Sequence, residues 1–189
     1  MKDMQGIEKA VRDLLIALGE DPNREGLIET PKRVAKMYAE TLEGLDYSNE
    51  EIARMFDKEF EVQSNDLVLV KDIECFSYCE HHMALIYDMH ISIAYLPDGK
   101  VLGISKLARI ADMVCKRLQI QERIGADIAD ILHMALGVED IMVSISAKHS
   151  CMTARGIRKT DAKTVTNTVR GRFETEPMLR SETLDMMRG

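Results

Sequence analysis

Residues 66–96 read DLVLVKDIECFSYCEHHMALIYDMHISIAYL, and this stretch decides the fold. Two runs inside it, 66–77 and 84–96, are rich in the branched and aromatic side chains that favour β-strands. Between them lies the motif CEHH at 79–82, where the chain has room only for a tight turn. A second turn signal, PDGK at 97–100, follows the second run. The stretch therefore predicts two strands that fold back on each other as a hairpin.

Two helices and two more strands are predicted after this hairpin. The first helix opens at Ser105, an N-cap residue, and the second stops at a glycine; each keeps its apolar residues on one face. Residues 140–151 then alternate apolar and polar side chains, which places His149 and Cys151 on the same side of a strand. Residues 164–173, rich in Thr and Val, are predicted to form the last strand.

The predicted order of the core elements is β-β-α-α-β-β, within residues 60–189. Two hairpin-like pairs of strands that flank two helices favour an α+β fold, in which an antiparallel sheet carries both helices on one face. Four strands leave two open edges, and pairing with another subunit commonly relieves such edges. We therefore expect this region to be one domain that assembles into an oligomer.

The region before residue 60 is predicted to be helical. Apolar residues recur with helical spacing between residues 7 and 18, and Thr30-Pro31 opens a second helix that runs to about residue 44. Ser48 and Glu51 have the spacing of a capping box for a short third helix. Residues 1–59 are thus expected to form a helical N-terminal segment.

The composition excludes several classes of protein. Hydrophobic residues make up 46% of the 189, which permits a substantial core, and the formal net charge is −7. That charge argues against a nucleic-acid or anionic-membrane partner. The sequence has no signal-peptide core and no apolar run of transmembrane length, and its cysteines fit a reducing compartment. We expect a cytoplasmic protein in which an anionic substrate would meet a local basic cluster.

Cysteine and histidine side chains, which a zinc ion prefers as ligands, gather in two short motifs. Cys79 and His82 are three residues apart, so one turn can direct both at a single ion, and Cys151 would complete a set of three. Three protein ligands leave the fourth tetrahedral position open, which distinguishes catalytic from structural zinc. His81 and His149 flank the ligands, where a proton-transfer group is needed. The motifs predict a metal-dependent hydrolytic enzyme.

An alternative metal site adds Cys75 as a fourth ligand and is closed and structural. The spacing of Cys75 from Cys79 permits this arrangement. However, Cys75 lies within an apolar strand, where a free cysteine is commonly a small hydrophobic residue. The open three-ligand site is therefore favoured, and Cys115, near the apolar face of its helix, is expected to be a packing residue.

Two helix starts have both a functional and an ordinary interpretation. Ser105 and Lys106, with Arg109 one turn on, could bind an anion because free N–H groups, the helix dipole and basic side chains converge there. The ordinary interpretation is an N-cap with solvated charges. Gln121 and Glu122 could be capping residues, or the carboxylate could accept two N–H donors of a purine edge. The spacing alone leaves these alternatives open.

Taken together, several blocks of sequence resemble the GTP cyclohydrolase I family. The blocks are EDP at 20–22, REGL at 24–27, TPKRVAKMY at 30–38, CEHH at 79–82, GISKL at 103–107, QIQER at 119–123 and HSCMTARG at 149–156. Any one block is only suggestive, but together they stand in the order of the family, and the match extends over nearly the whole chain. No residue of these motifs is substituted, so an active enzyme is expected.

The resemblance implies a tunnelling fold, an activity and an assembly. The family hydrolyses the imidazole ring of GTP at C8, releases formate and rearranges the ribose to give 7,8-dihydroneopterin triphosphate, the entry to folate or pterin synthesis. Its subunits form pentameric rings that stack into a decamer. Its pockets are built from neighbouring subunits, so the site residues need not meet within one chain.

The resemblance also implies a role for each matching residue. The expected Zn²⁺ ligands are Cys79, His82 and Cys151. The expected proton-transfer groups are His149 and His81, and Ser105 matches a serine of the later ribose rearrangement. Glu122 matches the carboxylate that binds guanine, and Gln121 lines the same pocket. The expected triphosphate-binding residues are Arg33, Lys106, Arg109 and Arg155.

Two rival classes of function remain open at this point. One is a zinc-stapled oligomeric module that binds a purine or pterin without cyclohydrolase activity, with Cys75 as the fourth ligand; removing its metal would unfold the chain. The other is a different enzyme on the same fold. Pterin synthases of that fold bind zinc through histidines alone, and nitrile-reducing relatives use cysteine without zinc. The combination of Cys79, His82 and Cys151 argues against both of these enzymes.

Overall fold

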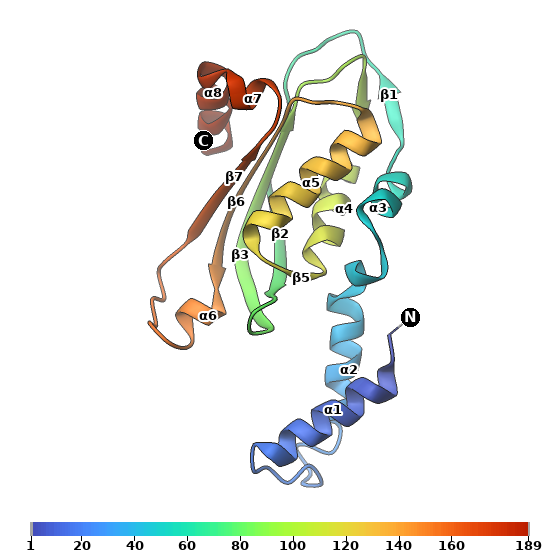
Figure 1. Ribbon diagram of the computed structural model, residues 1–189, viewed down its shortest axis with the longest axis vertical. Helices are drawn as coiled ribbons and strands as arrows, with labels where there is room; N and C mark the ends of the chain where they lie inside the picture. The colour runs from blue at the N-terminus through green and yellow to red at the C-terminus, as the bar shows by residue number, and fades with distance from the viewer. Residues whose placement is uncertain (1, 189) are drawn as a thin grey trace.

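The computed structural model describes residues 2–188. Met1, the first residue of the predicted N-terminal segment, and Gly189, the last residue of the predicted domain, lie outside the described part. Its main feature is a five-stranded sheet with the strand order β5-β2-β3-β6-β7 (Figure 1). All neighbouring strands are antiparallel except β2 and β5. The strands are β2 (Val68–Cys79), β3 (Ala84–Tyr95), β5 (Leu118–Gln119), β6 (Ile141–His149) and β7 (Thr164–Val169). A mixed α+β fold with a largely antiparallel sheet is therefore confirmed.

The predicted hairpin is present as β2 and β3. The strands are in register from Val68 opposite Tyr95 to Cys79 opposite Ala84, with a bulge on either side of the Ile73–Cys75 stretch. The CEHH motif therefore begins at the last residue of β2 and continues into the turn between the strands. The structure also contains two short strands that the predicted order lacks, β4 (Lys100–Leu102) and β5. Strand β4 pairs with β1 (Glu59–Glu61) in a separate two-stranded sheet.

The predicted last strand is shorter than expected. It ends at Val169, and Phe173 lies instead in α7 (Arg172–Thr175), where it is fully buried. Gly171 separates the two elements with a φ of +58°, a left-handed conformation that a strand residue does not adopt. The Thr- and Val-rich composition could not reveal this break, because it depends on one glycine.

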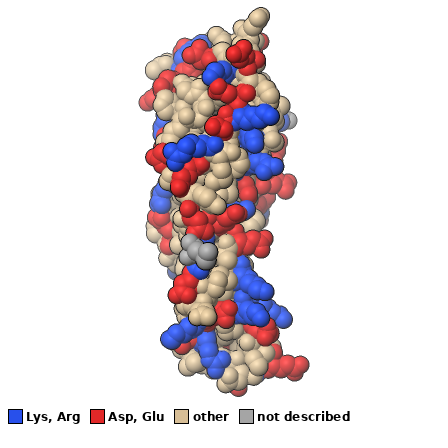
Figure 2. All heavy atoms as spheres, turned by 90° about the vertical axis from the view of Figure 1, so that its right-hand side faces the viewer, with Lys and Arg blue, Asp and Glu red and all other residues tan. Residues whose placement is uncertain are grey.

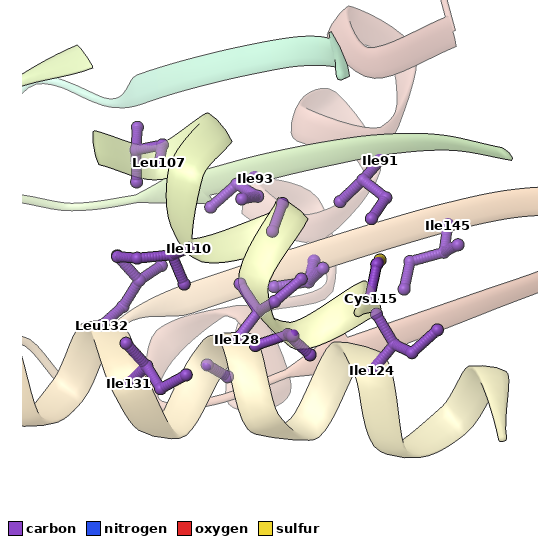
Figure 3. Close-up of a cluster of buried hydrophobic side chains, with 14 of the residues drawn as sticks. Ile91, Ile93, Leu107, Ile110, Cys115, Ile124, Ile128, Ile131, Leu132 and Ile145 are labelled. Atoms are coloured by element: carbon purple, nitrogen blue, oxygen red, sulfur yellow. The ribbon is translucent and has the colours of Figure 1, made fainter. Parts of the chain in front are cut away.

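The helices α4 (Ile104–Cys115) and α5 (Gln121–Leu136) both pack on one face of the sheet. Their apolar stripes meet the strands in the main core, where Ile110, Ile128 and Ile145 are almost completely excluded from water (Figure 3). Each such side chain contributes about 1.5–3 kcal/mol of hydrophobic free energy. The N-cap of α4 is Gly103 and not Ser105, so the predicted cap is wrong by two residues and the Ser105 hydroxyl is exposed on the first turn.

The opposite face of the sheet carries a second, smaller core. Strand residues alternate between the two faces, so Val68 packs in the main core while its neighbour Leu69 packs in the smaller one. The C-terminal helix α8 (Pro177–Arg188) covers this face together with α7, near the end of the sheet away from the β2–β3 turn (Figure 1). The smaller core contains the buried residues Ala94, Met142, Phe173 and Met187.

The N-terminal region is helical, as predicted. It contains α1 (Met4–Ala17), α2 (Thr30–Thr41), a 3₁₀ helix η1 (Glu43–Asp46) and α3 (Asn49–Met55). The predicted capping box is present at the start of α3. In Figure 1, α1 and α2 extend beyond the end of the sheet that carries the β2–β3 turn. No helix in the described chain combines the length and the hydropathy needed to cross a membrane.

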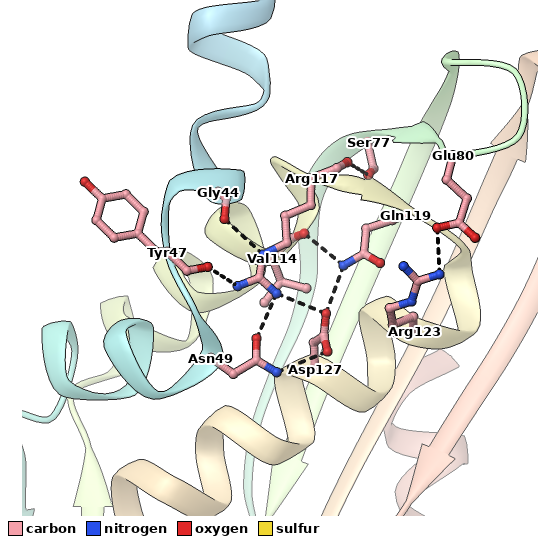
Figure 4. A network of polar contacts seen from close by, with 10 residues as sticks. All are labelled: Gly44, Tyr47, Asn49, Ser77, Glu80, Val114, Arg117, Gln119, Arg123 and Asp127. Atoms are coloured by element: carbon pink, nitrogen blue, oxygen red, sulfur yellow. Dashed lines mark hydrogen bonds and ion pairs between the residues drawn. The ribbon is translucent and has the colours of Figure 1, made fainter. Parts of the chain in front are cut away.

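A polar cluster, which we call the Arg117 clamp, joins this helical region to the core (Figure 4). The Arg117 guanidinium donates to the carbonyl oxygens of Gly44 at 3.1 Å and Tyr47 at 3.0 Å. It also donates to Asn49 Oδ1 at 2.8 Å and forms a 3.1 Å ion pair with Asp127 of α5. The chain at position 44 approaches the end of α4 so closely that a Cβ there would lie 2.1 Å from a backbone carbonyl oxygen.

Candidate metal centre and substrate site

Three predicted ligands converge at the turn end of the sheet. Cys79 is the last residue of β2, His82 lies in the turn, and Cys151 lies in the short helix α6 (Ser150–Thr153). One ligand atom from each lies within 4.8 Å of the other two. Two sulfur atoms and one imidazole nitrogen are the donor set that a zinc ion prefers. In the described part of the chain, this is the one group of three such residues close enough to hold an ion.

The route by which Cys151 reaches the site differs from the prediction. Strand β6 ends at His149, and the chain then turns into α6, so Cys151 is not on the strand. The alternating pattern continued by chance into the helical turn. The side chain of Tyr87 on β3 helps to place this turn, because its hydroxyl donates to Thr153 Oγ1 at 3.1 Å. Sequence reasoning missed Tyr87, since nothing in a strand pattern marks a tyrosine whose partner is 66 positions away.

The rival fourth ligand, Cys75, is directed elsewhere. Its thiol interacts with the Cys115 thiol of α4, and this interaction lowers the pKa of Cys75 below its ordinary value. Cys115 itself is buried, and its thiol lies 3.7 Å from the sulfur of Met89. Cys115 is therefore a packing residue, as predicted, and Cys75 belongs to the same part of the core and not to the ligand group.

Backbone and side-chain contacts hold the turn that carries His82. The Glu80 amide donates to the carbonyl oxygen of Gln119 at 3.0 Å, and the Glu80 carboxylate pairs with Arg123 of α5 at 2.7 Å. His81 Nδ1 lies 3.6 Å from Cys79 Sγ, beside the ligand group. Met83 has a φ of +48°, an uncommon left-handed conformation that completes the turn into β3.

Arg155, in the loop after α6, contacts one of the ligands directly. Its Nη1 lies 2.6 Å from Nε2 of His82. A guanidinium only donates hydrogen bonds, so Nε2 of His82 must accept with its single lone pair. That lone pair can accept from Arg155 or coordinate a metal ion, but not both. Metal binding through Nε2 therefore requires the Arg155 guanidinium to leave this contact.

The surroundings of the thiols fit a cation site. Burial, followed by the neighbouring thiol of Cys79, raises the pKa of Cys151 above its ordinary value, while the charge of Arg155 opposes this shift. A divalent cation held by these residues would favour the thiolate forms of both cysteines, because metal ligation and proton loss are coupled. The residues present therefore fit a zinc-type ion.

His149, at the end of β6, faces the helix α5 and is held by it. Its Nε2 lies 2.8 Å from the side-chain oxygen of Gln121, the first residue of α5. Burial lowers the pKa of His149 below its ordinary value, and the charge of Glu122 opposes this shift. Gln121 is 1% exposed, whereas Glu122 is exposed on the first turn of the helix. The two neighbouring residues thus differ in their access to a substrate.

The residues predicted on α4 do not reach this site within one chain. The amide of Leu102, just before α4, donates to the hydroxyl of Tyr95 at 3.1 Å, which places the start of α4 at the far end of β3. The ligand group lies at the Ala84 end, and eleven residues of strand span roughly 35 Å. Ser105, Lys106 and Arg109 are therefore remote from it, and the Lys106 ammonium lies 5.6 Å from the centre of a phenylalanine ring.

Arg33, by contrast, lies on a helix at the metal end. The ring centres of Tyr38 on α2 and Tyr78 on β2 are 5.9 Å apart, so α2 approaches the strand one residue before Cys79. Figure 2 shows the side of the molecule that is on the right in Figure 1. Basic side chains gather on the lower part of this side, at the level of α2. The exposed basic residues of α2 are Lys32, Arg33 and Lys36.

The fold and the ligand group together define an α+β protein with a candidate three-ligand thiolate and imidazole metal centre. The model of the GTP cyclohydrolase I family matches residues 7–188. The chain therefore belongs to the GTP cyclohydrolase I family.

Relatives and one solved structure are similar to the chain. A protein of Clostridium botulinum (strain Loch Maree / Type A3) named GTP cyclohydrolase 1 is 55% identical over 186 residues, which cover 95% of each chain. A protein of Clostridium acetobutylicum with the same name is 54% identical over 94% of this chain and 93% of its own. A crystal structure of the archaeosine synthase QueF-Like in the apo form has a TM-score of 0.48 and 18% identity, over 58% of this chain and 97% of that one.

Proposed function

We propose that the protein is a GTP cyclohydrolase that hydrolyses the imidazole ring of GTP at C8, releases formate and forms 7,8-dihydroneopterin triphosphate, the first step of tetrahydrofolate or pterin synthesis. The observation that carries this proposal is the convergence of Cys79, His82 and Cys151 within 4.8 Å, in a chain that belongs to the family. The binding-module alternative is not favoured, because it needs Cys75 as a ligand and Cys75 contacts Cys115 instead.

The proposed metal is Zn²⁺, held by the two thiolates and the imidazole. When bound, it would supply Lewis-acid activation of water for the hydrolytic step. His149 and His81 are the proposed proton-transfer groups. The His81 ring lies beside the ligand Cys79, and the ring of His149, two residues before Cys151, is fixed by a 2.8 Å hydrogen bond. The hydroxyl of Ser105 is the proposed group for the ribose rearrangement.

The proposed substrate contacts divide between the base and the phosphates. The exposed carboxylate of Glu122 can accept two N–H donors of guanine, which a neutral purine without those donors does not offer. Gln121, the neighbour of Glu122 at the start of α5, is almost fully buried. A triphosphate needs local positive charge in a chain with a net charge of −7. The residues proposed to supply it are Arg33, Lys106, Arg109 and Arg155.

We also propose that a complete pocket needs two subunits. Ser105 lies at one end of the sheet and His149 at the other, so one chain holds two separate half-sites. In the described structure β7 is an edge strand, and the outer side of β2 pairs only at Tyr78 and Cys79. Edges of this kind favour subunit pairing in a ring. The proposed assembly is a decamer of two pentameric rings, with residues 60–189 as a tunnelling-fold domain and 1–59 as its helical segment.

The activity can be tested directly with the purified protein. Incubation with GTP and Zn²⁺ should release formate in equal amount to a pterin that becomes fluorescent after oxidation. A Cys151→Ala variant serves as the control and should release neither. If the protein binds GTP but no formate appears, the cyclohydrolase proposal fails and the binding-module alternative is favoured.

Mixing two inactive variants tests the shared pocket. Ser105→Ala and His149→Ala each damage a different half-site, so exchange of subunits in an equal mixture should restore about a quarter of the wild-type activity, since one interface in four joins two intact halves. The measurement is pterin formation before and after exchange.

A second mixture controls for this test. His149→Ala and Cys151→Ala damage the same half-site, so their mixture should stay inactive after exchange. If the Ser105→Ala and His149→Ala mixture also stays inactive, although labelled subunits have exchanged, the pocket belongs to one chain. A fully active monomer in light scattering would contradict the assembly itself.

A further inference from the structure

Gln121 is placed unlike a substrate-binding residue. It is 1% exposed, and its amide nitrogen donates into the sheet. The acceptors are the carbonyl oxygen of Ile145 at 3.1 Å, the carbonyl oxygen of Thr164 at 3.0 Å and the hydroxyl of Thr166 at 3.2 Å. The two N–H bonds of the amide are thus engaged by β6 and β7. No N–H of this side chain is left for a ligand.

These contacts decide which way the amide of Gln121 points. The nitrogen and oxygen atoms of an amide are distinguished by their hydrogen-bond partners, and a backbone carbonyl can only accept. Two carbonyl oxygens beside the same amide atom therefore identify that atom as the nitrogen. The reversed orientation would bring the amide oxygen against the two carbonyl oxygens, neither of which can donate, and only the Thr166 hydroxyl could donate to it. The amide oxygen must consequently face His149.

The fixed amide in turn decides where His149 carries its proton. The oxygen of Gln121 lies 2.8 Å from Nε2 of His149, and an amide oxygen only accepts. Nε2 must therefore bear the hydrogen. In the neutral ring the other nitrogen, Nδ1, then has the lone pair and is the atom that exchanges a proton with a substrate.

We propose that Gln121 is a positioning residue that holds His149 in the Nε2–H tautomer and directs its Nδ1 toward the reacting purine. The part that concerns the purine rests on the proposed function, since His149 acts on the substrate only if GTP is turned over. The tautomer does not rest on it. Glu122, which is exposed beside Gln121, keeps the role of contacting the base.

The tautomer can be measured by solid-state NMR of the full-length, metal-loaded protein with 15N-labelled histidine. The signals lost in His149→Ala identify this ring. With the ring neutral, the spectrum of the wild type should show a protonated Nε2 and an unprotonated Nδ1. An Nδ1–H tautomer in the wild type would overturn the proposal, whatever the variants do and whether or not GTP is turned over.

Two substitutions separate positioning from substrate binding. Gln121→Met keeps the length of the side chain but removes the acceptor, so the ring should populate both tautomers and kcat should fall about 10²-fold, the scale of one proton-transfer contribution. Gln121→Glu, in its protonated form, can donate to the sheet and accept from Nε2, so it should preserve the tautomer and recover part of kcat.

The affinity for GTP shows whether Gln121 positions His149 or binds the substrate. Neither substitution should change the Kd for GTP more than about threefold, because loss of the acceptor acts through His149 and the side chain does not contact the base. A Kd that rises by the same factor as kcat/KM falls, with the tautomer unchanged, would make Gln121 a substrate-binding residue and overturn the proposal. An Nε2–H ring in a protein that does not turn over GTP would leave the tautomer standing and remove only the proposed function.

Discussion

Replacing any of Cys79, His82 and Cys151 by alanine is expected to abolish both metal binding and turnover. Loss of an outer partner of a metal ligand already lowers affinity by about 10- to 100-fold, so loss of a ligand itself should lower zinc affinity by more than about 10²-fold. Competition with a chromophoric chelator measures the affinity, and the fluorescent pterin assay measures the turnover.

Cys75→Ala is the matched control for these three substitutions. It also removes a thiol of β2, but that thiol contacts Cys115 and should not hold the ion. The variant should keep its zinc affinity and activity. Loss of zinc in Cys75→Ala, together with unfolding of the wild type when a chelator removes the metal, would instead support a closed structural site.

The substitution Arg117→Ala is expected to have the largest effect on stability. The side chains of Arg117 and Asp127 are only 13% and 15% exposed, so removing the guanidinium leaves a carboxylate with little solvent and no cation. Breaking a fully buried ion pair costs about 3–5 kcal/mol, and this largely shielded pair should cost up to that amount. Denaturant unfolding at a fixed protein concentration measures the loss, because assembly also contributes to stability.

Arg123→Ala provides the comparison for this prediction. Its ion pair with Glu80 has a similar length, 2.7 Å, but the side chains are 42% and 34% exposed. Solvent screens such a pair, and its loss should cost less than about 1 kcal/mol. Equal losses in the two variants would mean that the Arg117 clamp contributes no more than a surface ion pair.

Much of the fold follows from local patterns in the sequence. The β2–β3 hairpin was predicted because a tight turn separates two strand-forming runs, and α5 because its apolar residues recur along one face up to a glycine. These signals lie within a few residues of the elements they specify. The ends of elements were less predictable: Ser105 does not cap α4, and one glycine ends the last strand before Phe173.

The candidate site shows the same division between chemistry and geometry. Residue type was enough to select the three metal ligands, since thiol and imidazole groups are scarce in the chain. Their placement was not predictable in detail, because Cys151 reaches the site from a helical turn and not from the strand. The contacts of Gln121 were also hidden, since its partners on β6 and β7 are 24 to 45 positions away.

The Arg117 clamp also bears on how freely the sequence around it can diverge. Two of its four partners are the backbone carbonyl groups of Gly44 and Tyr47, which every amino acid would present equally. Substitutions at position 47 should therefore accumulate in relatives without loss of the clamp. Position 44 is different, because any side chain there would collide with the Met113 carbonyl oxygen, 2.1 Å from its Cβ. Of the two positions that bind through their backbone, position 47 is thus free to change, while position 44 stays fixed by the lack of space beside it.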